Sequence, residues 1–389
     1  MNGVRKIFRH VKGSASARDL ARNLACNLAL GFTLCLAMTG LSAPEAAAAD
    51  ATASLIRPVE LSTQPVRWNP DDRNDIKAGE LEYAGGLELT STDEAFGGWS
   101  GLAVSADGAM LVAVSDEAHW LSAQIIYDEK GRLAGLADAH MAPLRDLKGK
   151  PIASKVMGDA EGLAITGADP IKGEAYVSFE RHHRVWRYDF SAKGFDAVPS
   201  QIVTERQLGG MPGNSGIEAL TTLLPETGGD NQRLLALSED ARNNNGQRKA
   251  FLIEGRKVER LATKLDDPFK PTDVARLPNG DFLILERSFS LLAGPGMELR
   301  QVSAADVGAG ATLDGRLLMQ TNNRRMIDNM EGLAVRAGEK GEVLVYVMSD
   351  DNYNTLQKSL LMMFRMKLAP ATSAEENVLT LPHSPTKAE

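Results

Sequence analysis

The sequence predicts an all-β protein: a single β-propeller with five clear four-stranded repeats, and therefore five or six blades. Three observations predict this fold class. A short apolar motif recurs five times at intervals of about 55–61 residues. Each copy is followed, after a hairpin turn, by a second apolar run that ends in an acidic residue. Glycine is frequent, with 36 residues against 11 Phe, 6 Tyr and 4 Trp, which favours turn-rich β structure over helices.

Residues 1–49 have the features of a signal peptide. Six basic residues between positions 5 and 22 precede an apolar stretch over 28–41, and small residues then lead to a predicted cleavage site between Ala49 and Asp50. A transmembrane anchor is the alternative, but the roughly 14 apolar residues are too few to cross about 30 Å of hydrocarbon. We therefore expect a periplasmic or secreted protein.

Cleavage would change the composition of the chain. Both cysteines, Cys26 and Cys35, lie in the signal segment, so the mature chain would have no thiol and no disulfide. The formal charge of the whole chain is −8, and the residues after position 49 hold 37 Lys and Arg against 49 Asp and Glu, a charge of −12. We therefore expect that the chain binds neither nucleic acid nor, after cleavage, a membrane. We also expect it to be a monomer.

The rest of the chain divides into three parts. We expect an irregular segment over 50–79, the propeller over 80–368 and a flexible tail over 369–389. The strand predicted over 80–89 precedes the first repeat. We expect it to pair with the last blade and close the ring, because closure removes an open sheet edge.

The recurring motif predicts the innermost strand of each blade. Its copies lie at 99–104, 160–165, 217–220, 272–275 and 330–335. The clearest copies read Glu-Gly-Leu-Ala, and their Gly and Ala suit the crowded wall of a central channel. Turn sequences such as Ala-Asp-Gly at 106–108 and Pro-Asn-Gly-Asp at 278–281 lead into the second strand of a blade.

Acidic residues recur at two positions of the repeat. In an antiparallel pair the start of one strand and the end of the next lie at the same edge, so these acids should meet at one mouth of the channel. The pairs are Glu161 with Glu180, Glu218 with Glu239, Asp273 with Glu286, and Glu331 with Asp350, while the first blade offers Ser100 with Asp116.

Such a ring of carboxylates needs compensation. Two like unit charges 4 Å apart cost about 4 kcal/mol at an effective dielectric of 20. Protons, basic partners or a divalent cation could supply it, and hard oxygen ligands favour Ca²⁺, with Mg²⁺ also possible. The expected metal ligands are Glu161, Glu218, Asp273, Glu331, Asp350 and Asp116. The expected catalytic residues are Glu161, Glu180, Glu239 and Glu286, as ligands or as the base for water, with Arg181 and Arg287 stabilising developing charge.

The alternative for any one of these acids is structural, because propeller hairpins often end in acids that cap amides or pair with arginine. A purely structural cation is the intermediate case. Weaker candidates near the same mouth are His119, Trp120, His182, His183, Arg242, Lys358 and residues 322–325. The sequence has no G-x-S-x-G elbow, H-E-x-x-H, Walker A or dinucleotide-binding G-x-G-x-x-G motif.

Several motifs together resemble a known family. They are the Glu-Gly-Leu-Ala repeats, Pro271-Thr272-Asp273 with Glu286-Arg287-Ser288-Phe289, and Ser349-Asp350-Asp351-Asn352 with Leu361-Met362-Met363-Phe364. Over residues 80–368 the chain resembles the bacterial phytase-like proteins, whose domain is described as "esterase-like activity of phytase". The resemblance implies an exported propeller with phosphoesterase chemistry on its Glu and Asp residues.

The chain is also similar in outline to β-propeller phytases, which are calcium-dependent, six-bladed hydrolases of inositol hexakisphosphate. It departs from them in its five clear repeats and in lacking a dense Lys/Arg cluster. A simpler phosphate ester is therefore as good a substrate candidate as a highly phosphorylated one.

Three functions fit the sequence. The first is an exported, metal-dependent phosphoesterase that hydrolyses a small anionic phosphate ester at the acidic mouth. The second is a Ca²⁺-dependent lactonase or carboxylesterase acting on another small ester, because a cation can polarise an ester carbonyl. The third is a non-catalytic periplasmic propeller that binds a ligand, since fold alone does not dictate function.

Overall fold

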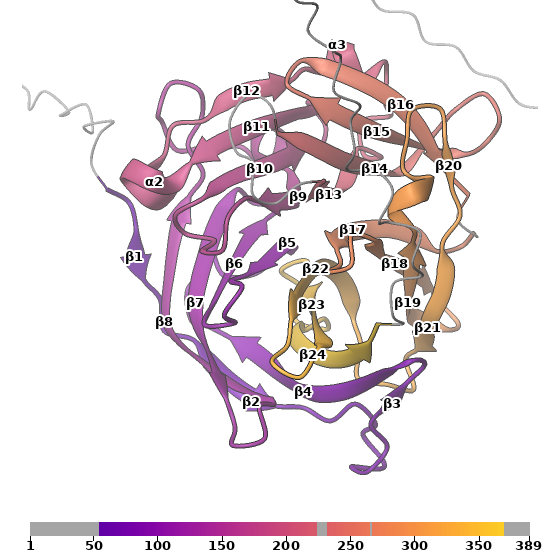
Figure 1. Ribbon diagram of the computed structural model, residues 1–389. Coiled ribbons are helices and arrows are strands. Elements are labelled where there is room, and N and C mark those ends of the chain that lie inside the picture. Colours follow the sequence, from indigo (N-terminus) through magenta and orange to yellow (C-terminus); the bar gives the residue numbers. More distant parts are fainter. Residues whose placement is uncertain (1–53, 224–231, 265–266, 369–389) are drawn as a thin grey trace, which may run out of the picture. The chain divides into compact units, whose positions relative to one another are not determined.

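Five antiparallel blades stand around a common centre (Figure 1). The computed structural model describes residues 54–223, 232–264 and 267–368, all within one compact unit, Asp50–Glu389. The predicted signal peptide over 1–49 and tail over 369–389 lie outside the described residues.

The first three blades follow the order of the chain from the centre outward. The first contains β5 (Trp99–Val104), β6 (Met110–Ser115), β7 (His119–Tyr127), β8 (Leu133–Pro143) and the edge strand β1 (Arg57–Pro58). The second contains β9 (Ala160–Ile165), β10 (Glu174–Phe179), β11 (Arg184–Asp189) and β12 (Ser200–Val203). The third contains β13 (Ile217–Thr222), β14 (Arg233–Arg242), β15 (Arg248–Glu254) and β16 (Lys257–Thr263), and β20 (Thr312–Leu313) pairs with β16 in parallel.

The last two blades complete the circle. The fourth contains β17 (Lys270–Arg276), β18 (Phe282–Ser290), β19 (Gly294–Val302) and β21 (Arg316–Asn322). The fifth contains β22 (Asn329–Ala337), β23 (Glu342–Asp350), β24 (Ser359–Lys367) and β4 (Leu81–Thr90), with β2 (Ser62–Pro65) and β3 (Lys77–Ala78) paired to β4. Short helical turns in the connections are α1 (Lys155–Gly158), α2 (Phe190–Lys193), η1 (Gly194–Asp196), α3 (Glu205–Leu208) and η3 (Ala304–Asp306).

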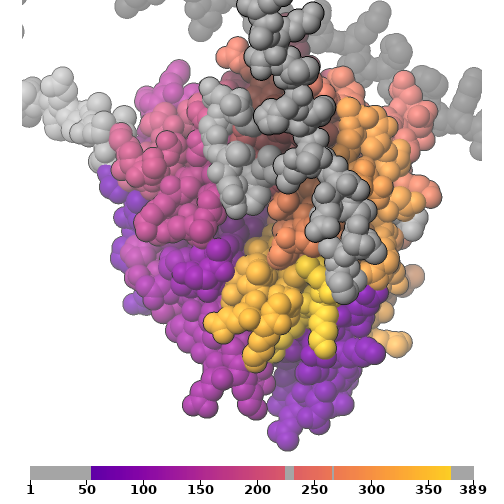
Figure 2. Space-filling model, viewed as in Figure 1, coloured from indigo at the N-terminus to yellow at the C-terminus, as the bar shows by residue number. Residues whose placement is uncertain are grey.

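The ring closes through the N-terminal strand. β4 pairs antiparallel with β24, so the yellow C-terminal strands lie beside indigo N-terminal chain in Figure 2. The inner strands contact one another in the cyclic order β5, β9, β13, β17, β22 and back to β5. The predicted propeller and its closure are therefore confirmed, with five blades in the described part of the chain. Residues 50–79, which we expected to be irregular, contain the short strands β1, β2 and β3.

The core lies between the blades. Five clusters of buried apolar side chains each take their members from two neighbouring blades. Both faces of a blade are thus covered. This explains why strands such as β6 and β23 are continuous apolar runs rather than alternating patterns.

Candidate functional site

A bulge near the start of each inner strand defines the first set of mouth residues. In β22, Met330 pairs with Ser349 and Gly332 with Met348, which leaves Glu331 without an opposite residue. The same register shift occurs in the other inner strands, and in β9 the extra position is shared by Glu161 and Gly162. A bulge re-aims its side chain at the rim of a sheet. The equivalent residues are Ser100, Glu161, Glu218, Thr272 and Glu331.

The second set lies at the end of the next strand. In each blade, the inner-strand residue before the bulge pairs with a residue near the end of the second strand. The residue that follows this partner in the second strand lies at the mouth. These second residues are Asp116, Glu180, Glu239, Arg287 and Asp350. The two sets together supply seven carboxyl groups at one end of the ring.

The fourth blade departs from the predicted set by one residue at both positions. Thr272 and Arg287 occupy the places that we assigned to Asp273 and Glu286. The Asp273 carboxylate accepts hydrogen bonds from the amides of Val274 (2.8 Å) and Leu333 (2.7 Å). The fully buried Glu286 carboxylate accepts one from Arg300 Nε (2.7 Å). Each of these two acids is thus hydrogen-bonded to a partner within the protein, Asp273 to backbone amides and Glu286 to Arg300.

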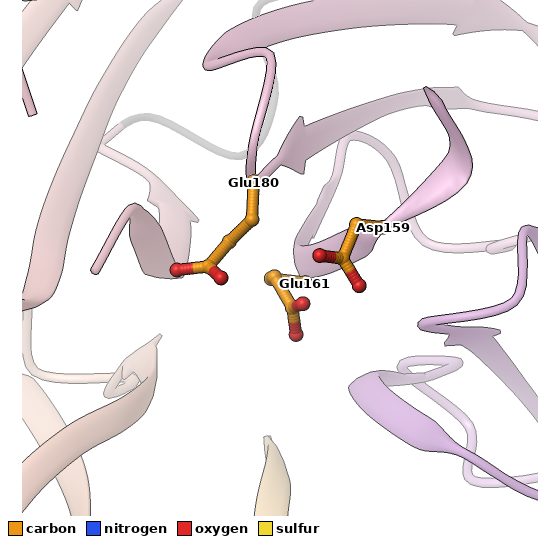
Figure 3. A group of neighbouring side chains, drawn as sticks. All are labelled: Asp159, Glu161 and Glu180. Carbon is orange, nitrogen blue, oxygen red and sulfur yellow. The ribbon is translucent and has the colours of Figure 1, made fainter. Parts of the chain in front are cut away.

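Three predicted acids converge from three blades. Oxygen atoms of Glu161, Glu218 and Glu331 lie within 4.8 Å of one another, and all three side chains are buried. A second group with the same spacing consists of Asp159, Glu161 and Glu180. Figure 3 shows these three carboxyl groups around a shared space. Glu161 belongs to both groups, so it links two places where a cation could bind.

Asp159 was not predicted, although it stands only two residues before Glu161. Its carboxylate accepts a hydrogen bond from Arg181 Nε (2.6 Å) and lies 3.0 Å from Lys155 Nζ. Lys155, at the start of α1, also forms an ion pair with Asp116. The sequence signal was the Gly-Asp-Ala-Glu run at 158–161, in which the acid precedes the repeat motif.

Arg287 is the basic member of the second set and lies among the acids. Its Nε is 3.1 Å from Glu331 Oε1 and its Nη2 is 3.5 Å from Glu239 Oε1. Glu239 also lies 3.3 Å from Lys270 Nζ, and Asn329 Nδ2 donates to Glu331 Oε1 at 2.7 Å. Within the described chain, the two sets and Asp159 together supply eight carboxyl groups, and four basic side chains form ion pairs with them, namely Lys155, Arg181, Lys270 and Arg287.

Burial and mutual repulsion make these acids hard to ionise. Burial raises the pKa of Glu161 and of Glu218 well above the usual range, and neighbouring carboxyl groups raise both further. Burial also raises the pKa of Glu331, although Arg287 opposes the shift. Burial and the nearby Glu331 raise the pKa of Asp350 to about 8. The site must therefore hold either protons or an added cation.

The weaker basic candidates have structural partners. The buried His183 hydrogen-bonds through Nε2 to the Pro212 carbonyl (2.9 Å). Its chain neighbour Arg184, which was not a candidate, places its Cζ 3.9 Å from the ring centre of Phe179. Arg242 pairs with Asp240 and Asp267, and Lys358 Nζ lies 2.6 Å from Glu88.

The remaining weaker candidates fall into buried and exposed groups. Trp120 is fully buried and packs against Tyr188, whereas His182 is exposed. His119 is half-buried, and burial lowers its pKa. In 322–325, Arg325 pairs with Asp75 at 2.6 Å.

The fold and the mouth define a five-bladed β-propeller with a buried acidic site on its axis. A family model, "Phytase-like: Esterase-like activity of phytase", matches residues 94–353, which is 260 of the 389 residues. The chain belongs to this phytase-like family, and the resemblance inferred from its motifs is confirmed.

Solved structures with a similar arrangement are distant. A protein of unknown function from Dyadobacter fermentans is 10% identical with a TM-score of 0.40, and the match covers 80% of this chain and 96% of that one. A PQQ-bound aldose sugar dehydrogenase from Streptomyces coelicolor is 11% identical with a TM-score of 0.36, covering 79% and 99%. A Bacteroides thetaiotaomicron protein of unknown function is 12% identical with a TM-score of 0.39, covering 78% and 76%. No curated protein matches this chain.

Helices contribute little to the described structure. None of those within residues 54–223, 232–264 and 267–368 has the length and apolar character needed to cross a membrane.

Proposed function

We propose that this chain is an exported hydrolase that uses a divalent cation, Ca²⁺ or Mg²⁺, to cleave a small phosphate ester at the acidic mouth. The observation that carries the proposal is the convergence of Glu161, Glu218 and Glu331 from three separate blades on one buried point. The family's description as esterase-like supports ester hydrolysis as the reaction type.

The residues present fit a hard cation. All the converging ligand atoms are carboxylate oxygens, which Ca²⁺ and Mg²⁺ prefer over softer donors. The Asp116 Oδ1 atom is buried and makes no hydrogen bond within the described chain, so it is a further free oxygen donor. A cation bound here would polarise the ester and lower the pKa of a bound water. It would also give this acidic chain the local positive charge that an anionic substrate requires.

The side chains around the central group would divide the remaining work. Glu161, Glu218 and Glu331 would hold the cation. Glu180 accepts a hydrogen bond from the Gly216 amide, which fixes its carboxylate beside Glu161, where it can take the proton of the attacking water. The water oxygen would form the new bond to phosphorus while the bond between phosphorus and the ester oxygen breaks, and the ester oxygen would leave with the proton that Glu180 took from the water. Arg181 and Arg287 can stabilise the charge on the phosphate oxygens.

The test is hydrolysis by the unit Asp50–Glu389, with p-nitrophenyl phosphate, phytate, aryl esters and lactones as substrates, with and without a chelator. We expect phosphate release that the chelator abolishes, that Glu161→Gln loses and that Glu129→Gln keeps, because Glu129 is exposed on a turn beyond β7, at the other end of the blade. Chelator-insensitive or absent phosphate release would contradict the proposal. Turnover of lactones or carboxylic esters alone would favour the lactonase or carboxylesterase, and Ca²⁺ binding without any turnover would favour the ligand-binding propeller.

A further inference from the structure

The most exposed large apolar side chains gather at the mouth. Leu292 is 100% exposed, Leu291 95%, Leu356 88% and Phe289 68%, whereas every other exposed large apolar side chain in the described chain is at most 47% exposed. Three of the four lie at the tip of the β18–β19 hairpin, and Leu356 lies in the β23–β24 connection. Both connections follow mouth residues, Arg287 and Asp350.

The β18–β19 hairpin projects beyond the mouth. Its pairing continues for four residues past Glu286, from Arg287 with Met297 to Ser290 with Gly294. The corresponding strands of the first, second and fifth blades end at Ser115, Phe179 and Asp350, whereas β14 of the third blade continues for four residues past Ser238, as β18 does past Glu286. At about 3.4 Å per residue, four residues carry the tip about 14 Å beyond Glu286. This exceeds the Debye length of about 8 Å at physiological salt, so exposed charges at the level of Glu286 are largely screened from a surface that touches the tip.

A basic hollow adjoins this hairpin. It has a volume of about 390 Å³ and is lined by Lys77, Arg324 and Arg325, with no acidic side chain among its described lining residues. The side chain of Asn323, between the lining residues Asn322 and Arg324, lies against Gly294 at the base of the tip. Arg325 is paired with Asp75, but neither Lys77 nor Arg324 forms an ion pair within the described chain.

We propose that the mouth face docks on an anionic phospholipid surface. Phe289, Leu291 and Leu292 enter the boundary between headgroups and acyl chains, and Lys77 and Arg324 bind lipid phosphate groups. An apolar tip beside unpaired basic groups matches such a surface in both polarity and charge. The net charge of the chain led us to expect no membrane partner. In the hollow beside this hairpin, the basic side chains of Lys77 and Arg324 form no ion pair within the described chain, and the proposal rests on these two groups.

The experiment is co-sedimentation of the unit Asp50–Glu389 with vesicles, which needs no hydrolytic activity. One set contains phosphatidylcholine alone and the other an equal mixture of phosphatidylcholine and phosphatidylglycerol. We expect binding to the mixed vesicles only, weakened by added salt. The double substitution L291S/L292S should weaken it by at least about tenfold, because it removes the apolar area that enters the lipid. The matched control is V198S/L317S, which changes two half-exposed apolar residues away from the mouth.

Two further measurements keep the test decisive. Lys77→Gln with Arg324→Gln should reduce binding to the mixed vesicles by at least about threefold and flatten its salt dependence. In the variant Leu292→Trp, tryptophan emission should shift to shorter wavelength when mixed vesicles are added. The proposal is overturned if mixed vesicles are not bound, if L291S/L292S binds them as tightly as V198S/L317S, or if the emission of Leu292→Trp does not shift.

Discussion

At the scale of single residues, Glu161 concentrates the repulsion at the mouth. It belongs to both groups of carboxyl groups that could share a cation, and burial raises its pKa well above the usual range. We expect Glu161→Gln to stabilise the metal-free protein at pH 8 by about 1–2 kcal/mol, because it removes a carboxyl group that must either be charged beside like charges or keep a proton that the unfolded chain has lost. Urea unfolding with a chelator measures this. In saturating Ca²⁺ the sign should reverse, because the variant loses a ligand. A variant that is less stable than wild type under both conditions would show that Glu161 stabilises the fold without a cation.

Arg287 has the opposite effect, because it partly neutralises Glu331 and Glu239. We expect Arg287→Gln to destabilise the metal-free protein at pH 8 by about 1–3 kcal/mol. This expected loss of stability lies at or below the range for breaking a buried ion pair, because the Arg287 side chain is 27% exposed. Added Ca²⁺ should recover part of the loss. The control is Arg132→Gln, which breaks an exposed pair with Asp128 and should cost less than about 1 kcal/mol. Equal losses of stability in the two variants would show that Arg287 does not stabilise the mouth by neutralising its acids.

The sequence predicted the places of most of these residues, and the two that it misplaced, Asp273 and Glu286, have one physical cause. Glu161, Glu218, Glu331, Glu180, Glu239, Asp116 and Asp350 all lie where the repeat placed them. In the fourth blade the register depends on which residue of Pro271-Thr272-Asp273 is bulged, and a β-strand presents alternate residues to opposite faces. An alignment of the repeats that matches acidic residues to acidic residues chooses Asp273 and Glu286. These lie one residue away from the positions that the bulge selects.

At the scale of elements, the inner strands approach one another so closely that some positions require glycine. A Cβ atom added at Gly162 of β9 would lie 2.5 Å from the carbonyl oxygen of Glu218 and 2.8 Å from Leu220 Cβ on β13. We expect Gly162→Ala to cost about 1–3 kcal/mol through overpacking. It should also weaken Ca²⁺ binding, because the strand that carries Glu218 must move. Urea unfolding and titration calorimetry measure the two effects. Gly213→Ala is the control, since a Cβ there meets nothing within 4 Å, and similar results for both variants would contradict the expectation.

The edge strands show which elements a repeat cannot predict. β1 and β2 have the sequences Arg-Pro and Ser-Thr-Gln-Pro, with no apolar alternation, and they form because β8 and β4 offer open edges for pairing. The strand that became β4 was predictable because its apolar residues fill the space between the fifth and first blades. Burial thus produces a pattern of apolar residues in the sequence, whereas the pairing of an edge strand through its backbone groups produces almost no such pattern.

At the scale of the whole molecule, closure of the ring forces the acids of separate blades together, so stability should depend on pH. Burial raises the pKa of Asp350 to about 8 and that of Glu286 to about 7, and it raises those of Glu161 and Glu218 as well. A carboxyl group with a raised pKa in the folded state binds more protons folded than unfolded, so its contribution is present at low pH and is lost as pH rises through the folded pKa. The metal-free protein should therefore lose stability between about pH 5 and pH 8.

Ca²⁺ should separate the two sources of this pH dependence. A bound cation replaces the protons on Glu161, Glu218 and Asp350, so most of the fall in stability should disappear. The share from Glu286 should persist, because its carboxylate lies against Arg300 in the fourth blade rather than in the central group. Urea unfolding at pH 5, 6, 7 and 8, with Ca²⁺ or with chelator, measures both parts. Stability that rises with pH in chelator, or a fall that Ca²⁺ leaves unchanged, would mean that the converging acids are neutralised by Arg287 and its basic neighbours alone.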